Sequence, residues 1–347
     1  MRPVNVEALA RWYADEARDL PWRATSDPWS ILLSEVLLQQ TQVARGIAYW
    51  RRLLERFPTV TSMAEADLDE VMHLWQGAGY YARGRRLHAL AVEVSDPEGP
   101  WNGALPSPST SEDVVAAFQQ LPGIGPYTAA AVASIAHEVP AAVADGNVRR
   151  VVARQTATLQ PTTADVTSLA QAWMDDAHGR NVAPSAWNQA VMELGATVCT
   201  PRAPRCSDCP VQQDCLARDH ASGPTAFPAP AKRRVITERL VALVDVDAQG
   251  RPHLIQRPSE ARFGGLWGPH YLDADGSGVT DECERRSKAG EVVHLLSHRR
   301  LEVEVWVGQV EHGVDPASKA ISTLDERVLE LAIGAWHRPF VESAKED

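Results

Sequence analysis

The sequence lacks any long hydrophobic run, and this absence argues against two classes of protein. No stretch approaches the ~18 consecutive apolar residues that a transmembrane helix requires. The first segment, MRPVNVEALARWYADEARDLPWR, carries charges throughout and contains no apolar core like that of a signal peptide. We therefore expect a cytoplasmic protein with no membrane partner.

A net positive charge is also lacking. The chain has 34 Lys and Arg against 45 Asp and Glu, which gives a formal net charge of −11. Net charge governs solubility and long-range steering, whereas phosphate contacts come from local basic patches. The acidic balance therefore argues against a nucleic-acid partner only weakly. Basic patches occur at residues 83–86, 149–154 and 232–234, and each alone is more typical of a solvated surface.

Cysteine is scarce, yet four of the five cysteines form one cluster. They are spaced Cys199-x6-Cys206-x2-Cys209-x5-Cys215, whereas Cys283 stands alone and is expected to be structural. In a reducing compartment such a cluster indicates a metal site rather than disulfide bonds. Zinc modules usually pair two short Cys hooks, and only one is present here. Four thiolates in a compact loop favour a [4Fe–4S] cluster, with zinc as the alternative.

Hydrophobic periodicity divides the chain into a helical part and a smaller α+β part. Up to about residue 220, apolar residues recur at helical spacing between Pro and Gly residues, and helix starts are expected at Asp27 and at residues 109–111. Residues 221–234 are rich in Pro and Ala, as in a linker. Beyond them, alternating residues predict a β-hairpin within 239–258 and a strand at 301–311.

The segment LPGIGPYTA, residues 121–129, joins two of the predicted helices, the second of which is expected to begin near Thr128. Gly123 and Gly125 permit positive φ and a close approach of the backbone. Backbone N–H groups at the start of the second helix can bind a phosphate without a basic side chain. A plain helix–turn–helix corner fits this segment equally well.

Two carboxylates occupy positions that suit acid–base chemistry. Asp145, two residues before Asn147, is expected at a helix start, where the helix dipole keeps it ionised; a simple N-cap is the alternative. Glu35, Gln39 and Gln42 lie at i, i+4 and i+7 of a predicted helix and form one polar stripe. Burial there would raise the pKa of Glu35, as a general acid requires, whereas a solvated helix edge is the alternative.

In this order, the hairpin, the aspartate and the four cysteines resemble the endonuclease III/MutY branch of the helix–hairpin–helix DNA glycosylases. SEVLLQQTQV, residues 34–43, resembles the motif that separates MutY-type adenine DNA glycosylases from endonuclease III. The resemblance implies a mainly α region at 1–220 and a Nudix-like α+β domain at 235–347 after the linker at 221–234. It implies a six-helix lobe at about 30–135 with the hairpin at 121–128, and a second lobe from 1–29 and 136–220. The [4Fe–4S] loop would be 199–215, held by Cys199, Cys206, Cys209 and Cys215.

The resemblance also implies a reaction and the residues that perform it. Glu35 would protonate N7 of a flipped adenine, and Asp145 would stabilise the sugar cation, with Asn147 beside it. Tyr127 stands where endonuclease III carries the lysine that forms a Schiff base, and a phenol cannot form one. The expected activity is that of a monofunctional glycosylase that excises adenine opposite 8-oxoguanine or G from double-stranded DNA.

Further matches concern contacts with DNA. Gln40 matches a residue that wedges into the duplex, and Tyr80 one that intercalates. The residues that the resemblance places against DNA or the base pocket are Trp22, Arg23, Gln40, Tyr80, Arg83, Gly123 and Gly125. In the C-terminal domain the Nudix catalytic box is absent, so lesion recognition without hydrolysis is expected. Leu296, Ser297 and His298 match the lesion-reading Phe-Ser-His loop without its aromatic residue.

Two alternatives stay open. One is a glycosylase of the same branch that acts on T or U mismatches or on oxidised pyrimidines, against which Glu35 and the C-terminal domain argue. The other is a non-catalytic iron–sulfur protein that binds DNA, against which the presence of both Glu35 and Asp145 argues. We expect a monomer of bacterial type that acts at the nucleoid.

Overall fold

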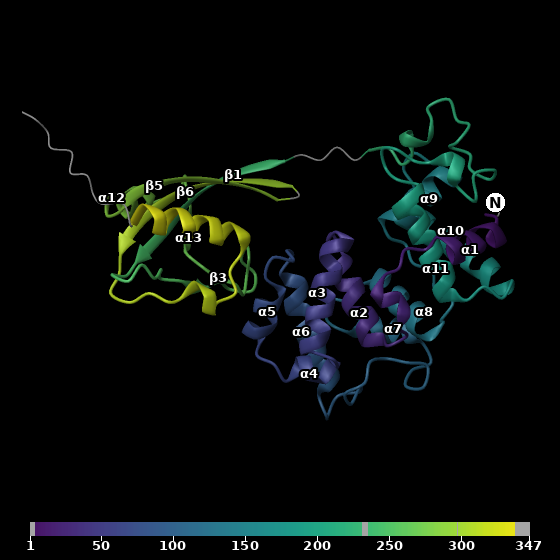
Figure 1. Ribbon diagram of the computed structural model, residues 1–347, viewed down its shortest axis with the longest axis horizontal. Coiled ribbons are helices and arrows are strands. Elements are labelled where there is room, and N and C mark those ends of the chain that lie inside the picture. Colours follow the sequence, from purple (N-terminus) through teal and green to yellow (C-terminus); the bar gives the residue numbers. More distant parts are fainter. Residues whose placement is uncertain (1–3, 231–234, 297, 337–347) are drawn as a thin grey trace, which may run out of the picture. The chain divides into compact units, whose positions relative to one another are not determined.

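The structure is a computed structural model that describes residues 4–230, 235–296 and 298–336. Ser297 and the basic run 232–234 therefore lie outside the described residues. Internal contacts divide the chain into two units, which are shown in Figure 1. We call residues 1–65 with 86–231 the helical unit and residues 66–85 with 232–347 the mixed unit. The boundaries drawn from the sequence stay a prediction; they differ in assigning 66–85 to the helical part.

The helical unit is built from helices joined by short connections, as the sequence predicts. Asp27 begins α2 as expected, because its side chain accepts a hydrogen bond from Ser30 N at 2.8 Å. The expected start at 109–111 falls slightly later, at the N-cap Asp113. The elements are α1 (Val6–Glu16), η1 (Pro21–Ala24), α2 (Pro28–Leu38), α3 (Val43–Arg56), α4 (Val60–Ala64), α6 (Ala82–Ser95), α7 (Val114–Gln120), α8 (Pro126–His137), α9 (Gly146–Gln155), α10 (Thr163–Gly179), α11 (Pro184–Glu193), η2 (Leu194–Val198), η3 (Cys206–Asp208) and η4 (Pro224–Ala226).

One core of this unit joins helices that are far apart in the sequence. Val6 and Leu9 of α1 pack with apolar residues of α8, α9, α10 and α11, among them the buried Trp187. The N-terminal helix therefore packs against the helices that follow residue 145. Elsewhere α2 packs against both α3 and α8, and α7 against α8. Because α8 contacts both groups, it lies at the centre of the unit.

The glycine segment forms a tight turn between α7 and α8. Gly123 has φ +78°, and a Cβ atom there would lie 2.8 Å from Cβ of Arg86, so glycine is required for both conformation and space. Gly125 is the N-cap of α8, which begins at Pro126 and therefore two residues before the expected Thr128. Proline is favoured at the first helical position, which explains this earlier start.

The mixed unit contains a four-stranded sheet, as predicted for an α+β domain. The strand order is β4-β1-β6-β5, with β1 parallel to β6 and the other two pairs antiparallel. Helix α13 packs against β1, β5 and β6 (Figure 1). The elements are α5 (Leu68–Trp75), β1 (Ile236–Val246), β2 (Ile255–Gln256), β3 (Trp267–Gly268), β4 (His270–Asp273), α12 (Val279–Glu284), β5 (Ser287–Leu295), β6 (Arg299–Gln309), η5 (Pro316–Ser318) and α13 (Thr323–Trp336).

The predicted β-hairpin within 239–258 is only partly present. The turn exists, with Asp247 N donating to Arg251 O, but pairing stops after a single bridge between Val246 and Pro252. Both edges of β1 are occupied by β4 and β6, and Pro252 has no N–H to donate. The chain then pairs β2 with β3 in a separate small sheet. The strand expected at 301–311 is confirmed as β6, two residues earlier.

Candidate active site

A cavity of about 670 Å³ in the helical unit brings several predicted site residues together. Its wall comes from η1, α2, the start of α8, the start of α9 and the end of α11. This volume is in the range of small-molecule pockets. The predicted residues that line it are Trp22, Arg23, Glu35, Gln40, Tyr127, Asp145 and Asn147.

Glu35 is the buried carboxyl group of this cavity. It lies on α2 with only 5% of its surface exposed, and the Tyr127 hydroxyl donates to its Oε2 at 2.6 Å. Burial raises the pKa of Glu35 to about 7; the Tyr127 hydrogen bond lowers it, and the charge of Asp145 raises it. The predicted rise in pKa is confirmed, and the alternative of a solvated helix edge is wrong.

The predicted polar stripe is interrupted, because α2 ends at Leu38. Gln39 is the C-cap, and its side chain donates to Thr128 Oγ1 at 3.2 Å. Gln40 has φ +65°, and Gln42 is the N-cap of α3, so Gln42 does not share a helix with Glu35. A residue whose backbone lies in the left-handed region cannot continue an α-helix, and the sequence contains no Gly or Pro here that would indicate the break. Such backbone strain is concentrated at functional sites.

Tyr127 lies in the first turn of α8 and belongs to the cavity as well as to the edge of the core. Burial raises the pKa of its phenol well above the ordinary value, and the charges of Glu35 and Asp145 raise it further. The phenol therefore stays protonated and acts as a hydrogen-bond donor. This contact with Glu35 goes beyond the role of a buried core tyrosine.

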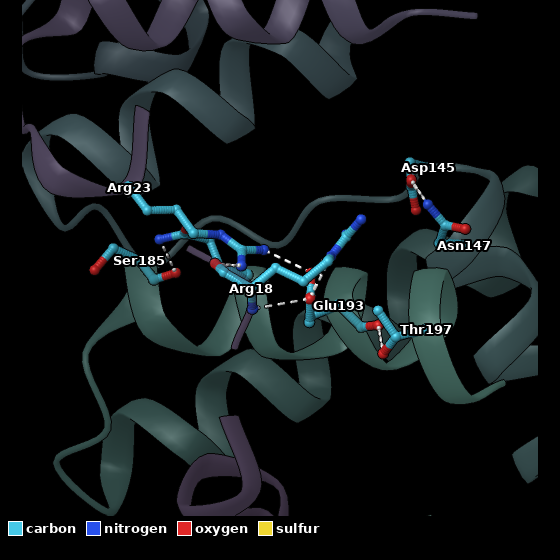
Figure 2. Close-up of polar contacts among 8 residues, drawn as sticks. Arg18, Arg23, Asp145, Asn147, Ser185, Glu193 and Thr197 are labelled. Carbon is cyan, nitrogen blue, oxygen red and sulfur yellow. Dashed lines mark hydrogen bonds and ion pairs between the residues drawn. The ribbon is translucent and has the colours of Figure 1, made fainter. Parts of the chain in front are cut away.

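Asp145 is the N-cap of α9, as predicted. Its carboxylate accepts from Val148 N at 2.7 Å and from Asn147 Nδ2 at 2.8 Å. Figure 2 shows the contact with Asn147. Burial nevertheless raises its pKa above the ordinary value, although both hydrogen bonds lower it. The N-cap position alone would have predicted the opposite direction, so burial has the larger effect here.

A chain of hydrogen bonds runs from Asp145 towards the cysteine loop, and the sequence reading did not contain it. Arg150 Nη2 donates to Asn147 Oδ1 at 2.8 Å and to Gly195 O at 2.6 Å, while its Nε donates to Cys199 O at 2.7 Å. Gly195 lies in the π-helical turn η2, where a Cβ atom would be 2.6 Å from Cβ of Asn147. The π turn and the glycine together allow this close packing.

A buried ion network forms another part of the wall. Glu193 is 1% exposed; it accepts from Arg18 Nε at 2.6 Å and from Arg23 Nη2 at 2.7 Å (Figure 2). The two arginines lower the pKa of Glu193 to about 2 against the opposing effect of burial. Arg23 also lies over the Tyr13 ring, 5.4 Å from its centroid. The roles of Arg18 and Glu193 were missed, because residues 175 positions apart leave no local pattern.

The four clustered cysteines line a second cavity of the helical unit, together with Arg154. Burial, with a smaller contribution from the other three cysteines, raises the pKa of the Cys209 thiol to about 12. A thiolate there requires a positively charged partner, which cluster iron would supply. Within the described residues, no three His, Cys, Asp or Glu side chains are arranged to hold a single metal ion.

The other predicted contact residues lie outside the cavity. In the mixed unit Tyr80 has φ +48° and is 41% exposed, and the buried Arg83 donates to Gly79 O at 3.1 Å. Arg83 has its guanidinium over the Tyr80 ring, and burial lowers its pKa to about 10. Leu296 packs against the core of the mixed unit, and His298 is exposed. The DNA contacts of these residues stay predictions, as does the role of Ser297, which is not described.

The fold and the hairpin agree with one class of repair proteins. A sequence model described as "HhH-GPD superfamily base excision DNA repair protein" matches residues 33–175. A solved structure of a thermostable thymine-DNA glycosylase superposes with a TM-score of 0.52 at 25% identity, covering 61% of this chain and 93% of that one.

None of the described helices is long and apolar enough to cross a membrane.

Curated relatives narrow this class. Adenine DNA glycosylase of Rattus norvegicus is 36% identical over 383 residues, covering 90% of this chain and 72% of the relative. Adenine DNA glycosylase of Mycobacterium tuberculosis (strain ATCC 25618 / H37Rv) is 38% identical over 245 residues, covering 68% and 74%. The chain belongs to the adenine DNA glycosylase family of the HhH-GPD superfamily.

Proposed function

We propose that this protein excises adenine paired with 8-oxoguanine or with G in double-stranded DNA, by hydrolysing the N-glycosidic bond and leaving the strand intact. The observation that carries the proposal is the pairing of Glu35 with Tyr127 in the cavity that Asp145 also lines. One carboxyl group is buried and readily protonated, and the other is fixed at a helix start. Glycosidic hydrolysis uses such a division between an acid and an anion.

Glu35 acts as the general acid. With a pKa of about 7, it holds a proton in roughly half of the molecules at neutral pH, whereas an ordinary Glu would be ionised. It donates this proton to N7 of the extrahelical adenine, which makes the base a better leaving group. The Tyr127 hydroxyl holds the carboxyl group in place through Oε2.

Asp145 stabilises the positive charge that develops on the sugar as the bond breaks. Val148 N and the Asn147 amide fix its two oxygens, so the carboxylate needs little reorganisation during the reaction. A water molecule then completes the hydrolysis. Because Tyr127 cannot form a Schiff base, strand cleavage by β-elimination is not expected.

Base flipping must precede this chemistry, and unstacking costs a few kcal/mol. Gln40 lies at the cavity wall in a strained conformation, which suits a residue that enters the space left by the base. The hairpin at Gly123 and Gly125 offers backbone N–H groups at the start of α8 to a DNA phosphate. The acidic chain thus binds DNA through backbone groups as well as through basic patches.

The four clustered cysteines are the residues that would hold a [4Fe–4S] cluster. They line one cavity, their side chains are half-buried, and Arg150 and Arg154 lie beside them to balance negative charge. The cluster would fix the loop that follows η2. The mixed unit, through Leu296, Ser297 and His298, would read the 8-oxoguanine. We expect the protein to act as a monomer at the bacterial nucleoid.

The decisive experiment is single-turnover base release from duplexes that carry 8-oxoguanine·A, G·A, G·T or thymine glycol. Adenine should be released from the first two duplexes without strand cleavage, and Glu35→Gln or Asp145→Asn should abolish release while preserving binding. Release of thymine or of the oxidised pyrimidine instead would favour a pyrimidine glycosylase. Binding without any release would favour a non-catalytic DNA-binding protein.

A further inference from the structure

Arg154 is a buried cation whose role the excision chemistry does not explain. It lies on α9 with 1% of its surface exposed, one helical turn after Arg150. Its guanidinium donates hydrogen bonds to backbone carbonyl groups and to one sulfur atom. The acceptors are Pro224 O (2.9 Å), Phe227 O (3.0 Å), Cys199 Sγ (3.3 Å), Thr200 O (2.8 Å) and Pro201 O (3.0 Å).

None of the partners found for Arg154 in the described part of the chain is a carboxylate. A buried charge is costly unless an opposite charge or strong hydrogen bonds compensate it. Arg154 lines the cysteine cavity, whose lining includes four thiols and no Asp or Glu. Cysteine thiolates are therefore the anions that this packing provides for the guanidinium.

The same guanidinium holds the beginning of the segment that leads to β1. Its Nε donates to both Pro224 O and Phe227 O. Phe227 is 2% exposed and packs with Ala153 and Ala217, and Ala229 N donates to Leu159 O at 2.7 Å. Residues 224–229 are thus fixed on the helical unit, although the sequence assigned them to a linker. Six residues, 230–235, separate them from the start of β1 at Ile236.

We propose that Arg154 is a positioning residue that ties the cysteine-bound cluster to the chain segment 224–227. This inference rests on the proposed [4Fe–4S] content. Its charge and its N–H···S bond to Cys199 stabilise the more negative, reduced form of the cluster, and so raise the reduction potential. Its bonds to the two carbonyls make the order of residues 224–227 depend on the same side chain.

The test uses the full-length protein purified with its cluster and three variants. Arg154→Met removes both the charge and the donors, and Arg154→Lys keeps the charge but cannot reach all five acceptors. Arg202→Met is the matched control, because Arg202 lies in the same loop between Cys199 and Cys206 but is exposed and does not line the cysteine cavity. The measurements are absorbance near 400 nm for cluster content, the reduction potential by voltammetry, and hydrogen–deuterium exchange of peptides that cover 221–230.

The expected results separate charge from geometry. Arg154→Met should shift the reduction potential to a more negative value and accelerate exchange in 221–230 several-fold. Arg154→Lys should shift the reduction potential much less, because it keeps the charge, but should still accelerate exchange. Arg202→Met should change neither. If cluster-loaded Arg154→Met has the wild-type potential and exchange, the role of Arg154 is refuted while the cluster stands. Wild-type protein without the absorbance band would overturn the cluster and this inference together.

Discussion

The carboxyl group of Glu35 is almost removed from water and shares a short hydrogen bond with Tyr127. Burial favours its neutral form, in which a carboxyl group can donate a proton. The same residue therefore affects the reaction and the stability of the fold, and both effects depend on pH. Two predictions follow from this at the scale of single residues.

The first concerns stability. The pKa of Glu35 rises from 4.5 in the unfolded chain to about 7 in the folded protein, so folding binds a proton between these pH values. This group should therefore destabilise the fold progressively as pH rises from 4.5 to 7, by roughly 3 kcal/mol in total. Glu35→Gln should remove that loss. Urea unfolding at pH 5 and pH 8 should show the variant gaining stability over wild type at pH 8; an equal difference at both pH values would contradict this.

The second concerns Tyr127→Phe. The Tyr127 hydrogen bond favours the ionised carboxylate, so its loss should raise the pKa of Glu35 further. The fall of base release at alkaline pH should move to higher pH, and the plateau rate should drop several-fold because Glu35 is less well oriented. Single-turnover rates across pH measure both effects. Tyr13→Phe serves as a control, since Tyr13 lies under Arg23, and an unmoved alkaline limb in Tyr127→Phe would refute the role.

At the scale of elements, local signals predicted the helices but not the way they meet. Asp27 and Asp145 were recognised as helix starts because N-caps are encoded by neighbouring residues. The end of α2 at Leu38 was not predicted, because Gln40 adopts a positive φ that the neighbouring residues do not indicate. The contacts of Glu193 with Arg18 join distant segments, and only the packed fold brings them together.

The π turn η2 yields the prediction at this scale. Gly195→Ala places a Cβ atom 2.6 Å from Cβ of Asn147 and 3.1 Å from its backbone, which should displace Asn147 from Asp145. The rate of base release should fall by about 10- to 100-fold, because small misplacements of catalytic groups have effects of this size. Gly179→Ala is the matched control, because a Cβ atom there meets nothing within 4 Å. Equal single-turnover rates for the two variants would contradict this account.

At the scale of the whole molecule, two large hydrophobic clusters found among the described residues are separate. The α-helical core around Trp187 and the sheet core around Val303 and Val305 share no residues. The sequence distinguished them by the change from helical to alternating periodicity. It could not show that residues 224–229 belong to the helical unit, because Pro and Ala are also typical of a linker.

This division predicts the effect of removing residues 235–347. The truncated protein should still release adenine, because the residues around Glu35 and Asp145 are supplied by the helical unit. Any preference of the full chain for 8-oxoguanine·A over G·A should be lost. Comparing single-turnover rates on both duplexes tests this, with Leu296→Ala and His298→Ala in the full chain as finer variants. A truncated protein that keeps the full preference would place lesion recognition outside residues 235–347.

The π turn at Leu194–Val198 also fixes the number of residues between α11 and the first cysteine. In this turn Cys199 N donates to Leu194 O, five residues back, so the turn contains one residue more than an α-helical turn. With this spacing, Arg150 reaches the carbonyl group of Cys199 and Arg154 reaches its Sγ. The turn therefore acts as a length reserve: a single deletion here could be absorbed by conversion to an α turn, at the cost of the close packing between Gly195 and Asn147.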